Sequence, residues 1–136
     1  MIYVRVPGHP VPKGSMTGLW SPSAGKVIVK HNSKKLKGWQ QDIGWIVRGE
    51  MNRIGFATLT GPVDLKLLFW IRGSITSPPD IDKLTRACLD ALTGVLYKDD
   101  SQVVALHVEK LPGVVNANLG VEIWAKERTH AEMDRL

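Results

Sequence analysis

Carboxylates are concentrated in one short stretch of the chain. Five of them fall within the segment PPDIDKLTRACLDALTGVLYKDDSQVV, residues 78–104: Asp80, Asp82, Asp90, Asp99 and Asp100. Aspartate oxygens suit Mg²⁺, a hard ion that accepts one or a few carboxylates, keeps several waters and binds substrate phosphate oxygens. Such an ion activates water and clamps a phosphodiester. The segment therefore indicates phosphodiester hydrolysis by metal-activated water.

The spacing of the first two aspartates indicates a helix N-terminus. Asp80 follows the Pro78-Pro79 pair, which favours extended backbone, and aspartate is a good N-cap, so Asp82 falls in the first turn. A helix dipole stabilises each carboxylate there by at most about 1 kcal/mol, which makes a bound cation the better reason for the pair. Asp99 and Asp100 are expected where the next strand begins. Whether they meet the first pair depends on the return path of the chain.

Arg86 is the basic candidate in the same helix. Asp82, Arg86 and Asp90 fall at successive i,i+4 positions, so Arg86 projects from the face that carries the carboxylates. It could hold the scissile phosphate or the charge that develops on it. The alternative is structural: Asp80 is only a cap, and Asp82 and Arg86 form an ordinary surface pair. Spacing alone leaves both readings open.

Positive charge is concentrated in the first part of the chain. The net charge is +5, but residues 1–49 carry +7 and residues 50–136 carry −2. This asymmetry favours a polyanion-binding surface beside a cation site, with a solvated basic face as the alternative. The lysines of this part that could contact the phosphates of such a polyanion are Lys13, Lys34, Lys35 and Lys37.

Hydrophobic periodicity predicts the elements that position these residues. Helical spacing predicts helices over residues 33–52 and from Asp80 to Gly94. Alternating apolar residues predict strands over 2–6, 27–29, 63–71, 104–108 and 119–125. The order β-(β)-α-β-α-β-β predicts a single α+β domain, residues 1–136, with two layers: a mixed β-sheet covered by two helices. The last two strands are expected to form a hairpin, residues 7–25 a basic Gly/Pro-rich loop, and residues 127–136 a tail.

Composition excludes several classes of protein. The single cysteine, Cys88, allows no internal disulfide and lies on the apolar stripe of the second helix, so we expect it buried and unreactive. No segment resembles a signal peptide or a membrane span, which predicts a cytoplasmic protein. Trp39 is expected in the core. Trp45, Trp70 and Trp124 are expected to pack on the sheet or to form a dimer interface.

The aspartate segment resembles the signature of the RusA-like Holliday junction resolvases. In that family an Asp-x-Asp pair opens a helix, an Asp-Ala-Leu follows within it, and Asp-Asp-x-Gln-Val closes the motif. The corresponding stretches here are Asp80-Ile81-Asp82, Asp90-Ala91-Leu92 and Asp99-Asp100-Ser101-Gln102-Val103. The N-terminal Pro10-Val11-Pro12-Lys13-Gly14 is similar to the family's Pro/Lys/Gly loop. The resemblance covers roughly residues 7–126.

The resemblance implies a homodimeric, Mg²⁺-dependent endonuclease that nicks two opposed strands of a four-way DNA junction in recombination and repair. Mn²⁺ is an alternative ion. Carried over by position, Asp80, Asp82 and Asp100 are the metal carboxylates, and Arg86 stands where the family has a lysine. Lys83 follows the second aspartate, where the family commonly has Asn, and is expected either to contact phosphate or to weaken metal affinity.

Asp90 and Asp99 are then supporting residues: Asp90 is either structural or a residue that supports the metal ligands, and Asp99 is a helper. The resemblance also implies a bacterial cell, with a phage-encoded gene as an alternative. Two other functions stay open. One is a branched-DNA-binding protein without catalysis, and the other is a nuclease that acts on flaps or forks.

Overall fold

Alternating apolar residues build a four-stranded sheet in the computed structural model, which describes residues 1–14, 16–21, 26–31, 33–113 and 118–129. The strands are β1 (Ile2–Pro7), β2 (Met16–Ser21), β3 (Lys26–His31), β4 (Val63–Ile71), β5 (Val103–Pro112) and β6 (Gly120–Glu127). The helices are α1 (Ser33–Ile54), α2 (Ile81–Leu92) and a 3-10 turn, η1 (Asp100–Gln102).

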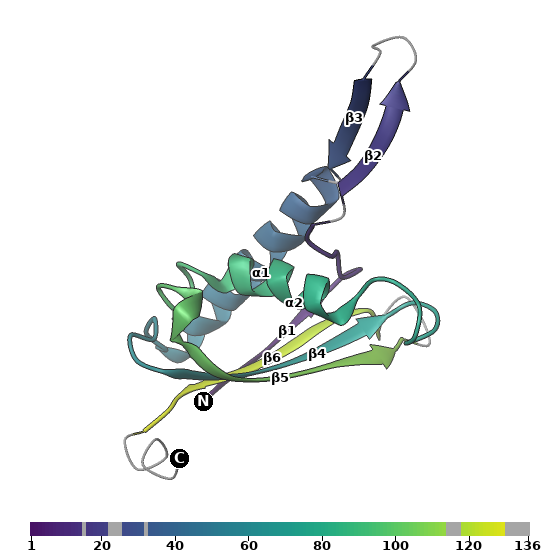
Figure 1. Cartoon of the computed structure of the whole chain (residues 1–136). Coiled ribbons are helices and arrows are strands. Elements are labelled where there is room, and N and C mark those ends of the chain that lie inside the picture. The colour runs from purple at the N-terminus through teal and green to yellow at the C-terminus, as the bar shows by residue number, and fades with distance from the viewer. Residues whose placement is uncertain (15, 22–25, 32, 114–117, 130–136) are drawn as a thin grey trace.

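The sheet is mixed, in the order β1-β6-β4-β5. β6 pairs antiparallel with both β1 and β4, whereas β5 pairs parallel with β4. Both helices lie on one face of this sheet (Figure 1). The α+β class and the two-layer arrangement are therefore confirmed.

The predicted hairpin of the last two strands is wrong. β5 lies at an edge of the sheet, and β4 separates it from β6. The inward-facing residues of β6, Val121, Ile123 and Ala125, are at most 1% exposed, whereas Val104 and Leu106 of β5 are 52% and 44% exposed. The strand with the more deeply buried face takes the interior of the sheet because burial of apolar area stabilises it there.

The two helices fill the space above the sheet as their periodicity predicts. Trp39, Ile43 and Val47 of α1 are buried, and α1 extends two residues past the predicted end to Ile54. Leu84, Ala87, Cys88 and Leu92 of α2 have no exposed surface, and Leu84, Cys88 and Leu92 belong to the same hydrophobic core cluster as the buried residues of β4 and β6. Burial raises the pKa of the Cys88 thiol to about 12. This confirms Cys88 as a buried residue and makes it a poor nucleophile.

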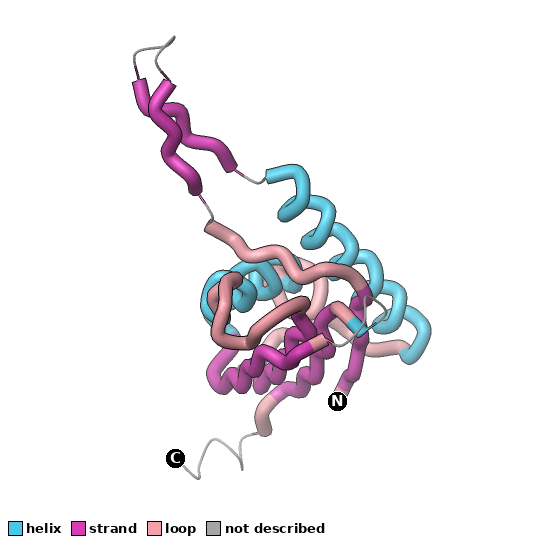
Figure 2. Tube along the Cα trace, turned by 90° about the vertical axis from the view of Figure 1, so that its right-hand side faces the viewer, coloured by secondary structure: helices cyan, strands magenta, loops and turns pink. Residues whose placement is uncertain are grey.

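The predicted loop 7–25 contains a strand. β2 and β3 pair antiparallel, with Met16 opposite His31 and Ser21 opposite Lys26. This two-stranded ribbon projects from the N-terminal end of α1, away from the sheet (Figure 2). The prediction missed it because the Gly, Pro and Ser residues around β2 suggested a loop, and only the partner strand β3 had an apolar run. Residues 130–136 of the predicted tail lie outside the described residues.

The outer face of the sheet, opposite the helices, carries aromatic side chains. Glu122 accepts hydrogen bonds from the Tyr3 hydroxyl at 2.6 Å and from Trp70 Nε1 at 2.7 Å. The Tyr3 and Trp124 rings lie 4.8 Å apart between centroids. Trp70 and Trp124 therefore pack on the sheet, while Trp45 on α1 is 78% exposed.

Candidate active site

The N-terminus of α2 is the first part of the candidate site. Asp80 has the extended backbone of an N-cap, with φ −69° and ψ 144°, as the sequence predicts. Its side chain, however, makes no capping hydrogen bond. The carboxylate oxygens of Asp80 therefore remain accessible to another ligand, and those of Asp82 lie in the same helical turn.

A basic side chain accompanies each of these carboxylates. Lys83 Nζ lies 3.7 Å from Asp80 Oδ2, and an Arg86 guanidinium nitrogen lies 3.6 Å from Asp82 Oδ2. The side chains of Asp80 and Asp82 are 60% and 58% exposed. Exposed pairs of this length contribute little to stability, so both carboxylates can exchange these partners for a cation. The predicted juxtaposition of Asp82 and Arg86 is present.

The Pro/Lys/Gly loop packs against the same helix. The backbone N–H of Lys13 donates to the Lys83 carbonyl at 3.0 Å, and Lys13 Nζ forms an ion pair with Asp90. Asp90 thus holds the loop against α2. Lys13, predicted to grip DNA, already has this partner in the folded chain.

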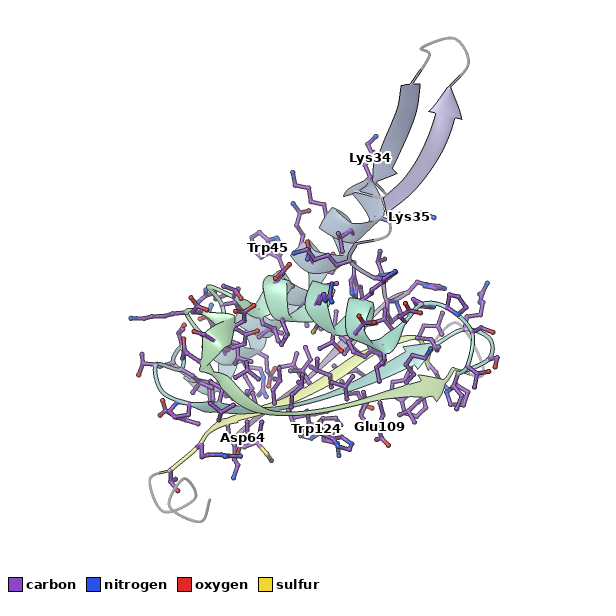
Figure 3. All side chains as sticks on the ribbon, viewed as in Figure 1. Lys34, Lys35, Trp45, Asp64, Glu109 and Trp124 are labelled. Carbon is purple, nitrogen blue, oxygen red and sulfur yellow. The ribbon has the colours of Figure 1, made fainter. Side chains whose placement is uncertain are left out.

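A hollow of about 540 Å³ lies between this loop and the start of α2. Its charged lining side chains are Lys35 of α1, Lys83 and Asp80, and His9 and Pro10 close it from the loop side. Lys34 and Lys35 lie at the end of α1 from which the β2–β3 ribbon projects (Figure 3). Lys37 is exposed in the next turn of the same helix. Of the three predicted α1 lysines, Lys35 is therefore the one that shares a cavity with Asp80.

Asp99 and Asp100 lie in a separate turn before β5. The Asp99 carboxylate accepts the Ser101 N–H at 2.9 Å and caps η1, and these hydrogen bonds hold its pKa below the ordinary value. Gln102 Oε1 accepts the N–H groups of Lys98 and Asp99, both at 2.9 Å, while its Nε2 donates to the carbonyls of Leu59 and Gly61. Asp99 thus shapes the turn that begins at Asp100.

One chain does not bring the three predicted metal ligands together. Lys110, near the end of β5, donates to the Pro79 carbonyl at 2.9 Å, whereas Asp100 precedes the start of β5. At a rise of about 3.3 Å per residue, the two ends of that ten-residue strand are about 30 Å apart. Within the described residues no group of three or more His, Cys, Asp or Glu side chains could hold a metal ion.

Two supporting residues were not predicted as part of the site. Lys110 holds the backbone before Asp80 through the carbonyls of Ser77 and Pro79, at 3.0 and 2.9 Å. The sequence did contain a hint of this role. Lys110 follows Leu106 and Val108 at two-residue spacing, so a charged side chain falls on the face of β5 that is otherwise apolar and faces inward. Gln102 braces the turn at Asp100 through its hydrogen bonds. In the sequence it was noted only as part of the Asp-Asp-x-Gln-Val motif, with no role of its own.

Carboxylates suit a hard cation, and lysine and arginine side chains suit a polyanion, so the exposed charges around α2 are chemically compatible with both ligands. The family model described as "Endodeoxyribonuclease RusA" matches residues 7–124 of the chain. The chain therefore belongs to the RusA endodeoxyribonuclease family. Nucleases of this family generally depend on a divalent metal ion.

One curated relative matches a shorter stretch. It is the "Uncharacterized protein YqaN" of Bacillus subtilis (strain 168), 51% identical over 35 residues. That match covers 26% of this chain and 25% of the relative's length. A separate observation concerns membranes: no helix in the described parts of the chain is long and apolar enough to span one.

Proposed function

We propose that the protein is a Mg²⁺-dependent, structure-specific endodeoxyribonuclease that resolves Holliday junctions by paired strand nicks. It acts as a homodimer on branched DNA in recombination and repair, in the cytoplasm of a bacterial cell, and Mn²⁺ can replace Mg²⁺. The family membership over residues 7–124 supports the nuclease class. The junction and the metal are our own assignments.

The observation that carries the proposal is that the Asp80 side chain, at the N-cap of α2, makes no capping hydrogen bond. An Asp at an N-cap usually bonds a backbone N–H of the first turn, yet Asp80 does not. Asp80 and Asp82 thus supply two accessible carboxylates, a donor set that fits Mg²⁺. A bound Mg²⁺ would supply Lewis acidity and lower the pKa of a bound water.

The third carboxylate of the proposed site, Asp100, has to come from a second copy of the chain. Asp100 and Asp80 lie at opposite ends of β5, so one chain cannot offer both to one ion. A homodimer related by a twofold axis would form two such sites, each with Asp80 and Asp82 from one copy and Asp100 from the other. Two equivalent sites suit a reaction that nicks two opposed strands.

The basic residues around α2 orient the DNA in this proposal. Arg86, one turn after Asp82, stabilises charge on the phosphate under attack. Lys35 and Lys83, which line the hollow beside Asp80, bind the neighbouring phosphate, and Lys34 and Lys37 extend this contact along α1. Asp90 positions Lys13, and Asp99 positions Asp100.

The first test is cleavage of a labelled four-way junction and of its linear duplex, with Mg²⁺ or with EDTA. We expect symmetric, metal-dependent nicks in the junction alone, and loss of cleavage in Asp82→Asn with binding retained. Tight binding without cleavage in any metal would instead indicate a non-catalytic junction-binding protein. Cleavage of flaps or forks in preference to the junction would change the substrate and keep the nuclease.

A mixing experiment tests the shared site. Asp82→Asn and Asp100→Asn are each expected to be inactive. Mixed and allowed to exchange subunits, they form heterodimers in which one site has all three aspartates and the other has lost two. Single-strand nicking of the junction should therefore return in the mixture. If the site lay within one chain, every site in the heterodimer would lack one aspartate and the mixture would stay inactive.

A further inference from the structure

The outer face of the sheet carries a row of aromatic and basic side chains that crosses all four strands. From β1 through β6 and β4 to β5, the residues that lie opposite one another in this row are Tyr3, Trp124, Lys66 and His107. Figure 3 shows Trp124 on the side of the sheet that faces away from both helices. The solvated face of a sheet is usually polar, so two neighbouring aromatic rings on it need an explanation.

Hydrogen bonds and ring contacts hold the aromatic side chains of this row in place. The Tyr3 and Trp124 ring centroids are 4.8 Å apart, and Lys66 Nζ lies 5.0 Å from the centroid of the Trp124 ring. The Tyr3 hydroxyl donates to Glu122, which also accepts from Trp70. Tyr3 nevertheless stays 43% exposed. Rings that are already fixed lose little conformational entropy when a flat ligand stacks on them.

An open hollow of about 450 Å³ adjoins the row on the same face. Its lining includes three cations and one carboxylate: Lys66, Lys126, Arg128 and Asp64. Arg128 Nε donates to Asp64 Oδ1 at 2.9 Å, so this carboxylate already has a cationic partner. The hollow therefore has a net positive charge, and Trp124 forms part of its wall. An aromatic wall beside cations suits a flat ring that carries an anionic group.

The order of these side chains favours nucleic acid over protein as the occupant. Unpaired bases stack on aromatic side chains, and the phosphates that join them pair with cations. An apolar protein segment would require a continuous apolar patch, which the charged Lys66 interrupts in the middle of the row. A duplex does not suit the rings either, because its bases are stacked on one another. In RNA-recognition domains a four-stranded sheet likewise stacks two or three bases on its aromatic side chains.

We propose that the outer face of the sheet binds an unpaired DNA strand, separately from the site that cuts DNA. The bases stack on Tyr3 and Trp124, and the cations of the hollow bind the adjacent phosphates. Asp80 and Asp82 belong to the N-terminus of α2, which lies on the other side of the sheet (Figure 1). The inference does not depend on the metal, the dimer or the junction. Only the choice of DNA over RNA follows from the family.

Fluorescence anisotropy with labelled oligo(dT) tests the stacking. In EDTA, which prevents metal-dependent cleavage, we expect the parent protein to bind this oligonucleotide. Trp124→Leu should weaken the binding about tenfold, a loss typical of one stacked base, whereas Trp124→Phe should keep most of it. Trp45→Leu removes a tryptophan that is 78% exposed on α1, and this matched control should leave the affinity unchanged. Circular dichroism should show that the variants fold.

Salt dependence tests the cations without a change at Trp124. Lys66→Met removes one charge, so the slope of log affinity for oligo(dT) against log salt should fall by about 0.7. The Mg²⁺ dependence of junction cleavage should not change in this variant, since Lys66 lies apart from the aspartates. Tyr3→Leu removes the more exposed ring without a change of charge. It should weaken oligo(dT) binding at an unchanged salt slope, and it tests stacking even if Trp124→Leu fails to fold.

Several results would overturn this inference. Equal oligo(dT) affinity of Trp124→Leu and the parent would place single-strand binding elsewhere on the chain. An equal loss of affinity for linear duplex in Trp124→Leu would mean attraction of phosphates without stacking. Tighter binding of oligo(U) than of oligo(dT) would reject DNA as the ligand. No binding of oligo(dT) by the parent would reject the site, and a changed sedimentation of Trp124→Leu would then assign the face to a protein partner.

The outcomes separate this inference from the proposed function. Oligo(dT) binding through Trp124 in a protein that cleaves no junction would keep the outer-face site and reject the proposed substrate. Junction cleavage without oligo(dT) binding would keep the nuclease and reject the outer-face site.

Discussion

The side-chain nitrogen of Lys110 donates a hydrogen bond to the carbonyl oxygen of Pro79, 2.9 Å away, and so links the end of β5 to the residue before Asp80. Replacing this lysine with methionine keeps the length of the side chain and removes the donor. We expect Lys110→Met to weaken Mg²⁺ binding about 10-fold, because a supporting contact to a metal-binding segment has been lost. A Mg²⁺ titration of junction cleavage measures this, with Lys66→Met on the opposite face of the sheet as control. An unchanged Mg²⁺ dependence would show that Lys110 does not position Asp80.

Lys13 has two possible roles: its ion pair with Asp90 holds the loop against α2, and its charge could also contact a DNA phosphate. If Lys13 also contacts a DNA phosphate, Lys13→Met should weaken junction binding and reduce the slope of log affinity against log salt by about 1. Asp90→Asn removes the partner and leaves the positive charge, so its salt slope should not fall. Equal slopes for Lys13→Met and the parent protein would confine Lys13 to the packing of the loop.

Gln102 braces the turn that carries Asp100 through four hydrogen bonds. Gln102→Ala is expected to lower the free energy of unfolding by about 1–3 kcal/mol, since several of the bonded backbone groups lose their partner. Gln102→Glu keeps the two acceptor bonds and loses the two donor bonds, so it should fall between Ala and the parent. Urea unfolding gives the ranking. A Gln102→Glu variant as unstable as Gln102→Ala would contradict it.

Glu122 should make the free energy of unfolding depend on pH in the acidic range. Burial, the largest single influence, raises its pKa, but the hydrogen bonds from Tyr3 and Trp70 together with the charges of Arg5 and Lys66 outweigh burial. The pKa is therefore below its ordinary value in the folded chain. A lowered carboxyl pKa contributes stability above the ordinary pKa of about 4.3, and this contribution is lost as pH falls through the folded value.

Glu122→Gln should consequently reduce stability at pH 7 by roughly 1 kcal/mol and have a smaller effect at about pH 3. Urea unfolding across this pH range measures the difference between the two proteins. A difference that stays constant across the range would mean that the Glu122 charge adds nothing.

Two glycines should respond to alanine in opposite directions. Gly120 has φ +151°, and a Cβ there would clash with the Val6 carbonyl oxygen, so Gly120→Ala should destabilise the protein by several kcal/mol. Gly49 lies inside α1, and an alanine methyl group there would have nothing within 4 Å. Gly49→Ala should therefore stabilise the protein by about 0.5–1 kcal/mol. Thermal unfolding of both variants checks the pair.

Local features of the fold could be predicted from the sequence, and the strand pairing could not. The 3.6-residue period from Leu84 to Leu92 and the N-cap at Asp80 are properties of neighbouring residues, and both are present in α2. The position of β6 depends on pairings such as Ile2 with Ala125, which connect the two ends of the chain. No local pattern encodes which of two apolar strands takes the interior, so the expected hairpin was wrong.

In the candidate site, too, contacts within one helix could be predicted from the sequence, and contacts between distant segments could not. Spacing along one helix predicted the neighbourhood of Asp82 and Arg86, and the structure has it. Contacts between distant segments, such as Lys13 with Asp90 and Lys110 with Pro79, needed the fold. The separation of Asp100 from Asp80 also needed it, because it depends on β5 running parallel to β4.

The position of β6 also governs how the chain can fold during synthesis. β6 is translated after every other strand, yet it fills the gap between β1 and β4. Until residues 120–127 leave the ribosome, β1 has no neighbour in the sheet, and β4 keeps one edge unpaired. Helices α1 and α2 can form early, but the layer they cover closes only when the last strand inserts. The nascent chain therefore carries open strand edges through almost its whole synthesis, and its slow step is one of long-range pairing.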